Sequence, residues 1–140
     1  ILLDSQDGKR VAKVSDLGLA KNFERAGLSG FTATGAAGGT PAYMPKEQII
    51  DFKRARPSSD VFSMGATFYN MLTGAYVYNF EKYDEAMIAI LEGDVCPIAE
   101  RDPSLPGPLA KVIDKALAPE MDDRFQDAGE MREAIKRILR

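Results

Sequence analysis

The chain has 140 residues, of which 18 are Lys or Arg and 21 are Asp or Glu, so its formal net charge is −3. This length and a hydrophobic content of 45% are typical of one globular domain, or part of one, with a core that needs no disulfide. The absence of histidine excludes Ser-His-Asp and Cys-His catalysis and nearly all zinc hydrolases. The single cysteine, Cys96, excludes an internal disulfide and is expected to be a small, partly buried side chain in a reducing compartment.

The charge and hydropathy patterns bear on partners and location. Basic residues are scattered along the chain, which argues against a nucleic-acid partner because neutralising phosphates takes clustered Lys and Arg. No apolar run approaches the ~20 residues that span a bilayer, and no signal-peptide pattern opens the chain. We expect a cytoplasmic protein, or the cytoplasmic domain of a membrane-anchored one. The apolar start without Met is typical of a sequence cut from a longer one.

The first third of the chain predicts a hairpin followed by a loop. Residues 1–3 and 11–14 are strand-like runs on either side of an Asp-Gly turn, which predicts two antiparallel strands. Residues 22–39 are rich in Gly, Ser, Thr and Ala without any period. Such long loops are usually functional or disordered.

Four helices are predicted after this loop. The first, over residues 60–73, begins after Ser58 or Ser59, ends at Gly74 and is apolar on all sides, so it should lie buried at the centre. The fold class predicted is therefore α+β, mainly α: a short β-hairpin plus a helical bundle around one buried central helix. The other three helices are predicted over residues 83–92 (Met87, Ile90 and Leu91 inward), 109–118 (Leu109, Val112, Ile113, Ala116 and Leu117 inward) and from Asp127 with Glu130 as a capping box (Met131, Ile135 and Ile138 inward).

Four short motifs follow one another along the chain. They are residues 11–21 (VAKVSDLGLAK), 39–48 (GTPAYMPKEQ), 59–65 (SDVFSMG) and 123–125 (DRF). In this order and spacing they resemble the lower, mostly helical lobe of a eukaryotic-type, bacterial-like serine/threonine protein kinase. The resemblance covers nearly the whole chain and implies a partial kinase domain over 1–140. Within it, residues 1–15 would be hairpin strands, 16–47 the activation segment and 48–140 a helical subdomain.

The resemblance implies a magnesium ligand in the second half of the first motif. Asp16 matches the aspartate of the kinase D-F-G motif, which holds the Mg²⁺ that bridges the ATP phosphates, and Gly18 matches its glycine. Leu17 replaces the usual phenylalanine with a smaller apolar side chain. The alternative is an aspartate that satisfies turn amides after a strand.

The loop between the first two motifs would be the activation loop. Thr32 and Thr34 stand where bacterial kinases of this type carry a phosphorylated Thr-x-Thr pair. A phosphate on either would add about −1.5 to −2 charges and would seek a basic partner, for which Lys21 and Arg25 are available. The alternative is two solvated threonines in a Gly-rich loop.

The second and fourth motifs imply a substrate-facing loop and an ion pair. Thr40 matches the threonine that lies near the catalytic aspartate of serine/threonine kinases and helps shape the substrate-facing loop. Glu47 matches the glutamate of the A-P-E motif, and Arg124 matches its arginine partner, so we expect a partly buried pair rather than two exposed charges. Pro45 and Lys46 replace Ala-Pro, which shifts the proline and inserts a cation.

The third motif implies structural roles for Asp60 and Gly65. Asp60 matches the kinase aspartate that accepts backbone hydrogen bonds from the catalytic loop, although an acid at a helix start is also favoured by the helix dipole. Because the matching catalytic loop would precede Ile1, a buried Asp60 would lack its donors. We expect water, a rearranged segment, a second copy or a partner chain to relieve that cost.

Several parts of a complete kinase are not found in the sequence. It has no Gly-rich phosphate loop, no strand lysine and no H-R-D catalytic loop, so no complete set of catalytic residues is present. Mg²⁺ and ATP are expected in the complete kinase, and neither is expected to bind tightly to this chain alone. The expected partners are a protein substrate, the missing N-lobe and catalytic loop, and a second copy through exposed lobe surface. The isolated chain is predicted to lack phosphotransferase activity.

Three functional hypotheses stay open at this point. The chain belongs to an active serine/threonine kinase, or to a catalytically inactive, kinase-derived binding or scaffold module, which Leu17 and Lys46 favour. The third hypothesis is a helical scaffold unrelated to kinases, which the serial motifs disfavour. An intact H-R-D motif and strand lysine upstream would separate the first two.

Overall fold

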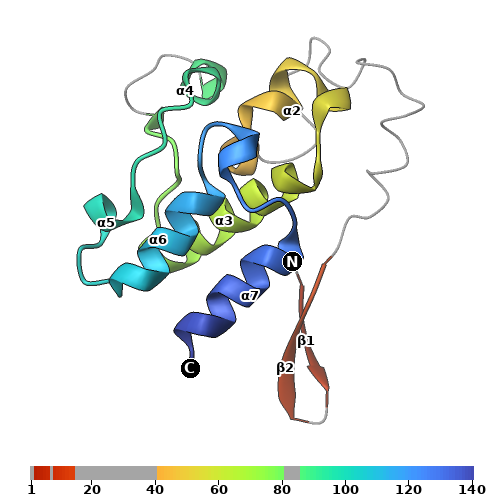
Figure 1. The fold of residues 1–140 in the computed structure, drawn as a ribbon, viewed down its shortest axis with the longest axis vertical. Helices are drawn as coiled ribbons and strands as arrows, with labels where there is room; N and C mark the ends of the chain where they lie inside the picture. The colour runs from red at the N-terminus through yellow and green to blue at the C-terminus, as the bar shows by residue number, and fades with distance from the viewer. Residues whose placement is uncertain (1, 7, 15–40, 81–85) are drawn as a thin grey trace. The chain divides into compact units, whose positions relative to one another are not determined.

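The computed structural model describes residues 2–6, 8–14, 41–80 and 86–140. The chain divides into two units, residues 1–38 and residues 39–140, and each is treated by itself. The first unit contributes the small sheet and the second contributes the helices (Figure 1). Among the described residues the fold is therefore mainly helical with one two-stranded sheet, as expected.

The sheet is an antiparallel hairpin of β1 (Leu2–Gln6) and β2 (Lys9–Lys13). Its register pairs Leu2 with Lys13 and Gln6 with Lys9, so two residues connect the strands. Gly8 in this connection has φ 74°, a left-handed conformation that favours glycine and is typical of tight hairpins. The predicted hairpin is confirmed, with strands longer and slightly shifted from the predicted runs.

The second unit consists of short 3₁₀ turns and α-helices. In chain order these are η2 (Pro41–Tyr43), α2 (Lys46–Ile50), η3 (Phe52–Arg54), α3 (Pro57–Thr73), α4 (Ala86–Glu92), α5 (Ile98–Arg101), α6 (Gly107–Ala116), η5 (Met121–Asp123) and α7 (Ala128–Ile138).

Helix α3 is the centre of this unit. It packs against α5, α6, α7, η2 and η5 (Figure 1). It begins at Pro57, one turn earlier than predicted, and Ser59 Oγ accepts a hydrogen bond from the Arg56 backbone N–H at 3.2 Å. It ends as predicted at Gly74, whose φ of 70° allows its N–H to bond the Asn70 carbonyl.

Burial along α3 is less uniform than its apolar sequence predicts. Phe62 and Tyr69 are buried in the core, whereas Met71 is 73% exposed and Leu72 is also exposed. From Val61 to Asn70 every residue is buried or partly buried, so the prediction of burial on every side holds only in part there and is wrong for the last turn. The neighbouring helices cover the first part of α3, and its last turn extends beyond them.

A glycine sets the close approach of α3 to α6. Gly65 is buried, and a Cβ added there would lie 2.9 Å from the Cβ of Ala116 and 3.3 Å from Leu117. Real Cβ atoms do not approach so closely, so the two helices could not keep this separation with a larger residue. The structural role expected for Gly65 therefore has a packing cause.

Helix α4 is described from Ala86, and residues 83–85 of the predicted helix lie outside the described part of the chain. Ala89 and Ile90 are fully buried, whereas Leu91 is exposed. The predicted inward face is therefore wrong at Leu91. Helix α4 packs against α2 and η2.

The last two long helices begin much as predicted. Pro108 lies in the first turn of α6, and Ile113 faces the core. Asp127 Oδ1 accepts the Glu130 backbone N–H at 2.9 Å, and the Glu130 carboxylate accepts the Gln126 backbone N–H at 2.9 Å. The predicted capping box is confirmed, with the return bond displaced by one residue.

Helix α5 was not predicted from the sequence. Its four residues are too few for a periodic pattern, and only Ile98 is buried. The Ile98 backbone N–H donates to Asp114 Oδ1 of α6 at 2.9 Å, which ties the start of α5 to that helix.

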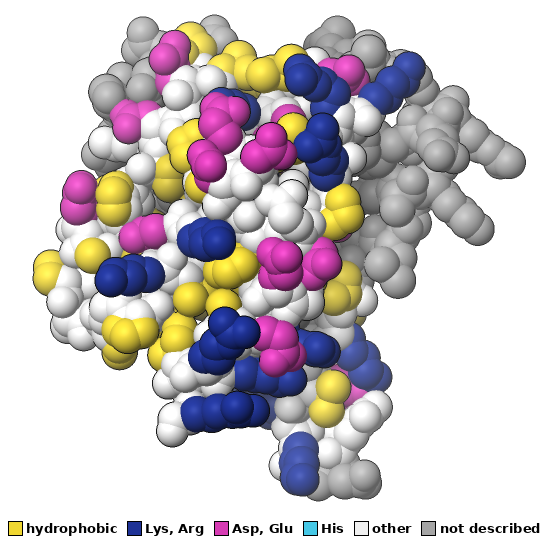
Figure 2. Space-filling view, viewed as in Figure 1, with side chains coloured by type: hydrophobic (Ala, Val, Ile, Leu, Met, Phe, Trp, Pro, Cys, Tyr) yellow, Lys and Arg dark blue, Asp and Glu magenta, His cyan; other side chains and the backbone are white. Residues whose placement is uncertain are grey.

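The fold gathers some of the basic residues that are scattered in the sequence. Lys and Arg side chains cluster over α7 in Figure 2, and this helix carries Arg132, Lys136 and Arg137. Glu133 pairs with Arg132 at 3.3 Å and with Lys136 at 3.0 Å. The basic last turn also complements the negative end of the helix dipole.

Candidate functional site: the Glu47–Arg124 junction

Five of the predicted site residues lie outside the described part of the chain: Asp16, Gly18, Thr32, Thr34 and Thr40. Their roles in magnesium binding, phosphorylation and substrate recognition therefore stay predictions. Within residues 2–6, 8–14, 41–80 and 86–140, no group of three or more His, Cys, Asp or Glu side chains could hold a metal ion. None of the helices in those ranges is long and apolar enough to cross a membrane.

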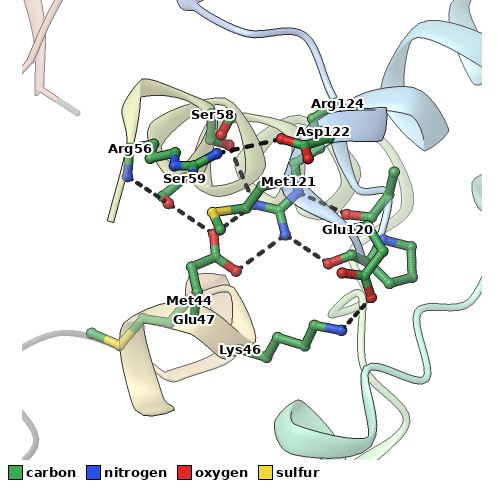
Figure 3. Close-up of polar contacts among 12 residues, drawn as sticks. Met44, Lys46, Glu47, Arg56, Ser58, Ser59, Glu120, Met121, Asp122 and Arg124 are labelled. Atoms are coloured by element: carbon green, nitrogen blue, oxygen red, sulfur yellow. Dashed lines mark hydrogen bonds and ion pairs between the residues drawn. The ribbon is translucent and has the colours of Figure 1, made fainter. Parts of the chain in front are cut away.

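The predicted ion pair joins two segments that lie 77 residues apart in the chain. Arg124 Nη1 donates to Glu47 Oε1 at 2.7 Å, and Arg124 Nη2 donates to Glu47 Oε2 at 3.2 Å (Figure 3). The side chains are only 1% and 7% exposed, respectively. The prediction of a pair is confirmed, and the pair is more fully buried than expected.

All the hydrogen-bonding capacity of the guanidinium is used. Besides the two bonds to the carboxylate, Nε donates to the Ala118 carbonyl at 2.7 Å, Nη1 to the Ser58 carbonyl at 3.3 Å and Nη2 to the Pro119 carbonyl at 3.1 Å. A guanidinium has five N–H groups, and each has an acceptor here. Arg124 thus fixes the end of α6 and the start of α3 to α2.

The carboxylate of Glu47 is held in its charged form. Ser59 Oγ donates to Glu47 Oε1 at 2.7 Å, and the Phe62 ring lies 4.8 Å from the guanidinium carbon of Arg124. Burial alone would raise the pKa of Glu47, but the hydrogen bonds from Arg124 and Ser59 outweigh it and lower the pKa below its ordinary value. The junction is therefore an ionised, hydrogen-bonded cluster inside the protein.

Two exposed ion pairs lie beside this cluster. Lys46 Nζ lies 2.7 Å from Glu120 Oε1, and Arg56 Nη1 lies 3.4 Å from Asp122 Oδ1 (Figure 3). The first pair uses the cation that departs from the kinase pattern, so Lys46 adds an outer link between α2 and the segment after α6. Side-chain exposures of 28% and 70% in this pair predict a weak contribution.

The segment before α2 is tied down by tyrosines that the sequence analysis did not single out. Tyr78 is buried and its hydroxyl donates to the Met44 carbonyl at 2.9 Å, and burial raises its pKa. The Tyr43 hydroxyl donates to Asn70 Oδ1 of α3 at 3.1 Å. No local pattern marks these bonds, because each joins residues at least 27 positions apart. Residues 42–45 are thereby fixed on the helical unit.

Asp60 is reached by solvent, which is one of the outcomes expected for it. The structure leaves this side chain exposed on the first turn of α3. Solvent reaches the carboxylate, and the burial cost that would call for another partner does not arise. Its position suits the positive end of the helix dipole.

Comparison with known proteins assigns the chain to a family. The family model of the protein kinase domain matches residues 1–137. The serine/threonine-protein kinase PknB of Mycobacterium tuberculosis is 35% identical over 127 residues, which are 90% of this chain and 20% of that protein. PknK of Mycobacterium bovis, also named a serine/threonine-protein kinase, is 32% identical over 132 residues, 91% of this chain and 11% of that protein.

A third relative carries a different name. The tyrosine-protein kinase MasK of Myxococcus xanthus is 32% identical over 127 residues, 91% of this chain and 19% of that protein. The chain thus spans between about a tenth and a fifth of the length of these relatives. With the family match over nearly its full length and the predicted Glu47–Arg124 pair in place, the chain belongs to the protein kinase domain family.

Proposed function

We propose that the chain is the activation-segment and substrate-binding part of a serine/threonine protein kinase, which transfers the γ-phosphoryl group of ATP to protein Ser or Thr. The observation that carries this proposal is the buried Glu47–Arg124 junction. It links the end of the proposed activation segment to the helical unit, and all five guanidinium donors are satisfied there. A protein substrate needs a fixed platform, and the bonds of Tyr43 and Tyr78 support one directly before α2.

The proposal divides the chain into three parts of the lower lobe of a kinase. Residues 1–15 would be hairpin strands, 16–47 the activation segment and 48–140 the helical subdomain of the lower lobe. The N-lobe and the catalytic loop would come from the rest of the kinase. Since its donor is ATP, we place the kinase in the cytoplasm, either free or as the cytoplasmic domain of an anchored protein.

Within this proposal Asp16 would hold Mg²⁺ on the ATP phosphates. A carboxylate oxygen is the kind of ligand that Mg²⁺ prefers, and the bound ion would neutralise charge on the transferring phosphoryl group. Thr40 would shape the substrate-facing loop, and Thr32 and Thr34 would be phosphorylated in the activation loop. The similarity to MasK leaves the acceptor residue open between Ser/Thr and Tyr, and the match of Thr40 favours Ser/Thr.

A catalytically inactive, kinase-derived binding module is the second candidate. Leu17 in place of the usual phenylalanine and the Lys46–Glu120 link favour it, since both change parts that control the activation segment. The two candidates differ in phosphotransferase activity and share the same structural junction.

The deciding experiment uses the full-length protein that contains this chain, with ATP, Mg²⁺ and a generic basic protein substrate. We expect phosphoserine and phosphothreonine in the product, and Asp16→Asn should lower kcat at least about a hundredfold because a metal's charge stabilisation is worth several kcal/mol. Asp4→Asn, which changes a partly exposed hairpin carboxylate that pairs with Lys13, is the matched control. A full-length protein without activity would support the binding module, and phosphotyrosine alone would contradict the Ser/Thr assignment.

A further inference from the structure

One face of the helical unit is strongly basic, although the whole chain has a net charge of −3. Helices α6 and α7 pack against each other, and Lys and Arg side chains gather over α7 in Figure 2. The exposed cations of these two helices, and of the residues directly after α7, are Lys111, Lys115, Arg132, Lys136, Arg137 and Arg140. We call this surface the α6–α7 basic face.

An open hollow brings cations of both helices to one side of the unit. Its volume is about 610 Å³, and its lining includes Lys115 of α6 together with Arg132 and Arg137 of α7. Lys111 lies one turn before Lys115 on the same side of α6, since residues four apart share a helix face. Lys115 Nζ lies 4.7 Å from the centre of the buried Phe125 ring, which holds this ammonium group against the wall of the hollow.

The acidic side chains that line the hollow are already bonded within the protein. They are Asp127, Glu130 and Glu133. The first two accept the backbone N–H groups that cap α7, at 2.9 Å each. Glu133 Oε1 lies 3.3 Å from Arg132 Nη2 and 3.0 Å from Lys136 Nζ, so one carboxylate is shared by two cations.

The other cations of the face have no such partner. Within the described part of the chain, no carboxylate lies at ion-pair distance from Lys111, Lys115, Arg137 or Arg140. The α6–α7 basic face therefore presents unpaired positive charge to solvent. Such a surface attracts an anionic partner and repels a cationic one.

We propose that the α6–α7 basic face binds the surface of a membrane that contains anionic phospholipids, independently of any phosphotransferase activity. The cations are spread over two helices around an open hollow, which suits a partner whose negative charges are also spread over a surface. Leu139 lies directly after α7, between Arg137 and Arg140, and is 81% exposed. An exposed apolar side chain flanked by cations is typical of helices that lie on membranes, where it enters the apolar layer below the headgroups.

The same features favour a lipid surface over other anionic partners. Single-stranded nucleic acids stack their bases on exposed aromatic rings, and Phe125, the aromatic residue that lines the hollow, is buried. An acidic protein segment offers carboxylates to the cations but no apolar layer to Leu139. The net charge of the whole chain is negative, so attraction at this face alone would orient the protein with α7 toward the membrane.

Binding of the purified protein to lipid vesicles tests the proposal. Vesicles made of equal parts of phosphatidylserine and phosphatidylcholine are compared with vesicles of phosphatidylcholine alone, by cosedimentation at low and high salt. We expect binding to the anionic vesicles only. The binding should weaken in high salt, because ions screen charges that are exposed to solvent.

Two double variants remove the same charge from different surfaces. Lys115→Gln with Arg137→Gln should lower the vesicle partition coefficient at least about tenfold, since each cation near an anionic surface contributes about fivefold. Lys53→Gln with Arg54→Gln changes two cations of η3 and is the matched control, which should stay within about twofold of wild type. All four side chains are exposed, so neither double variant should alter the fold.

Two kinds of result would overturn the proposal. The first is that the anionic vesicles bind no protein, and poly-L-glutamate and a DNA duplex are tested in parallel to interpret that result. Binding to either polymer without binding to the vesicles would assign the face to an acidic protein or to a nucleic acid. The second is an equal loss of vesicle binding in the two double variants, which would show an effect of net charge rather than of the α6–α7 basic face.

Discussion

Lys46 and Glu47 are consecutive residues at the start of α2, and each forms an ion pair with the segment around η5. Glu47 meets a guanidinium in the interior, where both side chains are almost fully buried and every donor is used. Lys46 meets Glu120 at the same distance of 2.7 Å, but water reaches both side chains. Equal distances therefore do not imply equal energies: loss of a buried partner leaves a charge without solvation, whereas loss of an exposed one does not.

The largest expected effect comes from breaking the buried pair. Arg124→Ala should lower the free energy of unfolding by roughly 3–5 kcal/mol, because it leaves the Glu47 carboxylate buried without its partner and three backbone carbonyls without their donor. Urea denaturation of the purified chain measures it. Arg124→Lys keeps the charge without the planar fork and should recover only part of the loss. A loss of a few tenths of a kcal/mol would show that the pair is solvated.

The second largest loss of stability is expected from overpacking the contact between α3 and α6. Gly65→Ala would place a methyl group 2.9 Å from the Ala116 Cβ, so it should cost about 1–3 kcal/mol by overpacking. Denaturant melts should show partial recovery in the double variant with Ala116→Gly, which removes the opposing methyl group. If Gly65→Ala is neutral, α3 and α6 can separate without cost.

The pH dependence of stability should separate the two acids. The pKa of Glu47 is lowered in the folded state, so its contribution is complete above the ordinary glutamate range and is lost as pH falls through its folded pKa. Melts from about pH 7 to about pH 3 should show a shallower loss in Glu47→Gln than in wild type. Glu120→Gln is the control from the exposed pair, and equal slopes in the two variants would contradict the assignment to Glu47.

The smallest effect is expected at the exposed pair. Lys46→Ala should cost less than about 1 kcal/mol, and the difference from wild type should shrink further in high salt. Denaturant melts at low and high ionic strength measure both. A salt-independent loss as large as that of Arg124→Ala would mean that Lys46 belongs to the buried cluster.

Local signals in the sequence predicted those parts of the fold that depend on neighbouring residues. The Asp-Gly turn predicted the hairpin, Gly74 predicted the end of α3, and Asp127 with Glu130 predicted the start of α7. Each signal works within about four residues, through a backbone angle or a capping bond. The Glu47–Arg124 pair was also predicted, but only through the resemblance to kinases, because nothing local relates residues so far apart.

The predictions that the structure contradicts concern burial, which depends on segments far apart in the chain. Leu91 was expected inside and is exposed, the last turn of α3 was expected to be buried and exposes Met71 and Leu72, and α5 was not predicted at all. In each case the outcome depends on which other element covers the residue. An apolar stripe or a family match cannot supply that information, since burial is a property of the neighbours.

The sequence by itself therefore determined the element types, the main caps and turns, the exclusion of histidine chemistry and the kinase motifs in their order. Only the tertiary structure decided that Arg124 finds an acceptor for each of its five donors, that Tyr78 fixes the Met44 carbonyl and that Gly65 sets the approach of α3 to α6. Short-range backbone preferences are encoded within a few residues. Burial and hydrogen-bond satisfaction arise only where distant segments meet and exclude water.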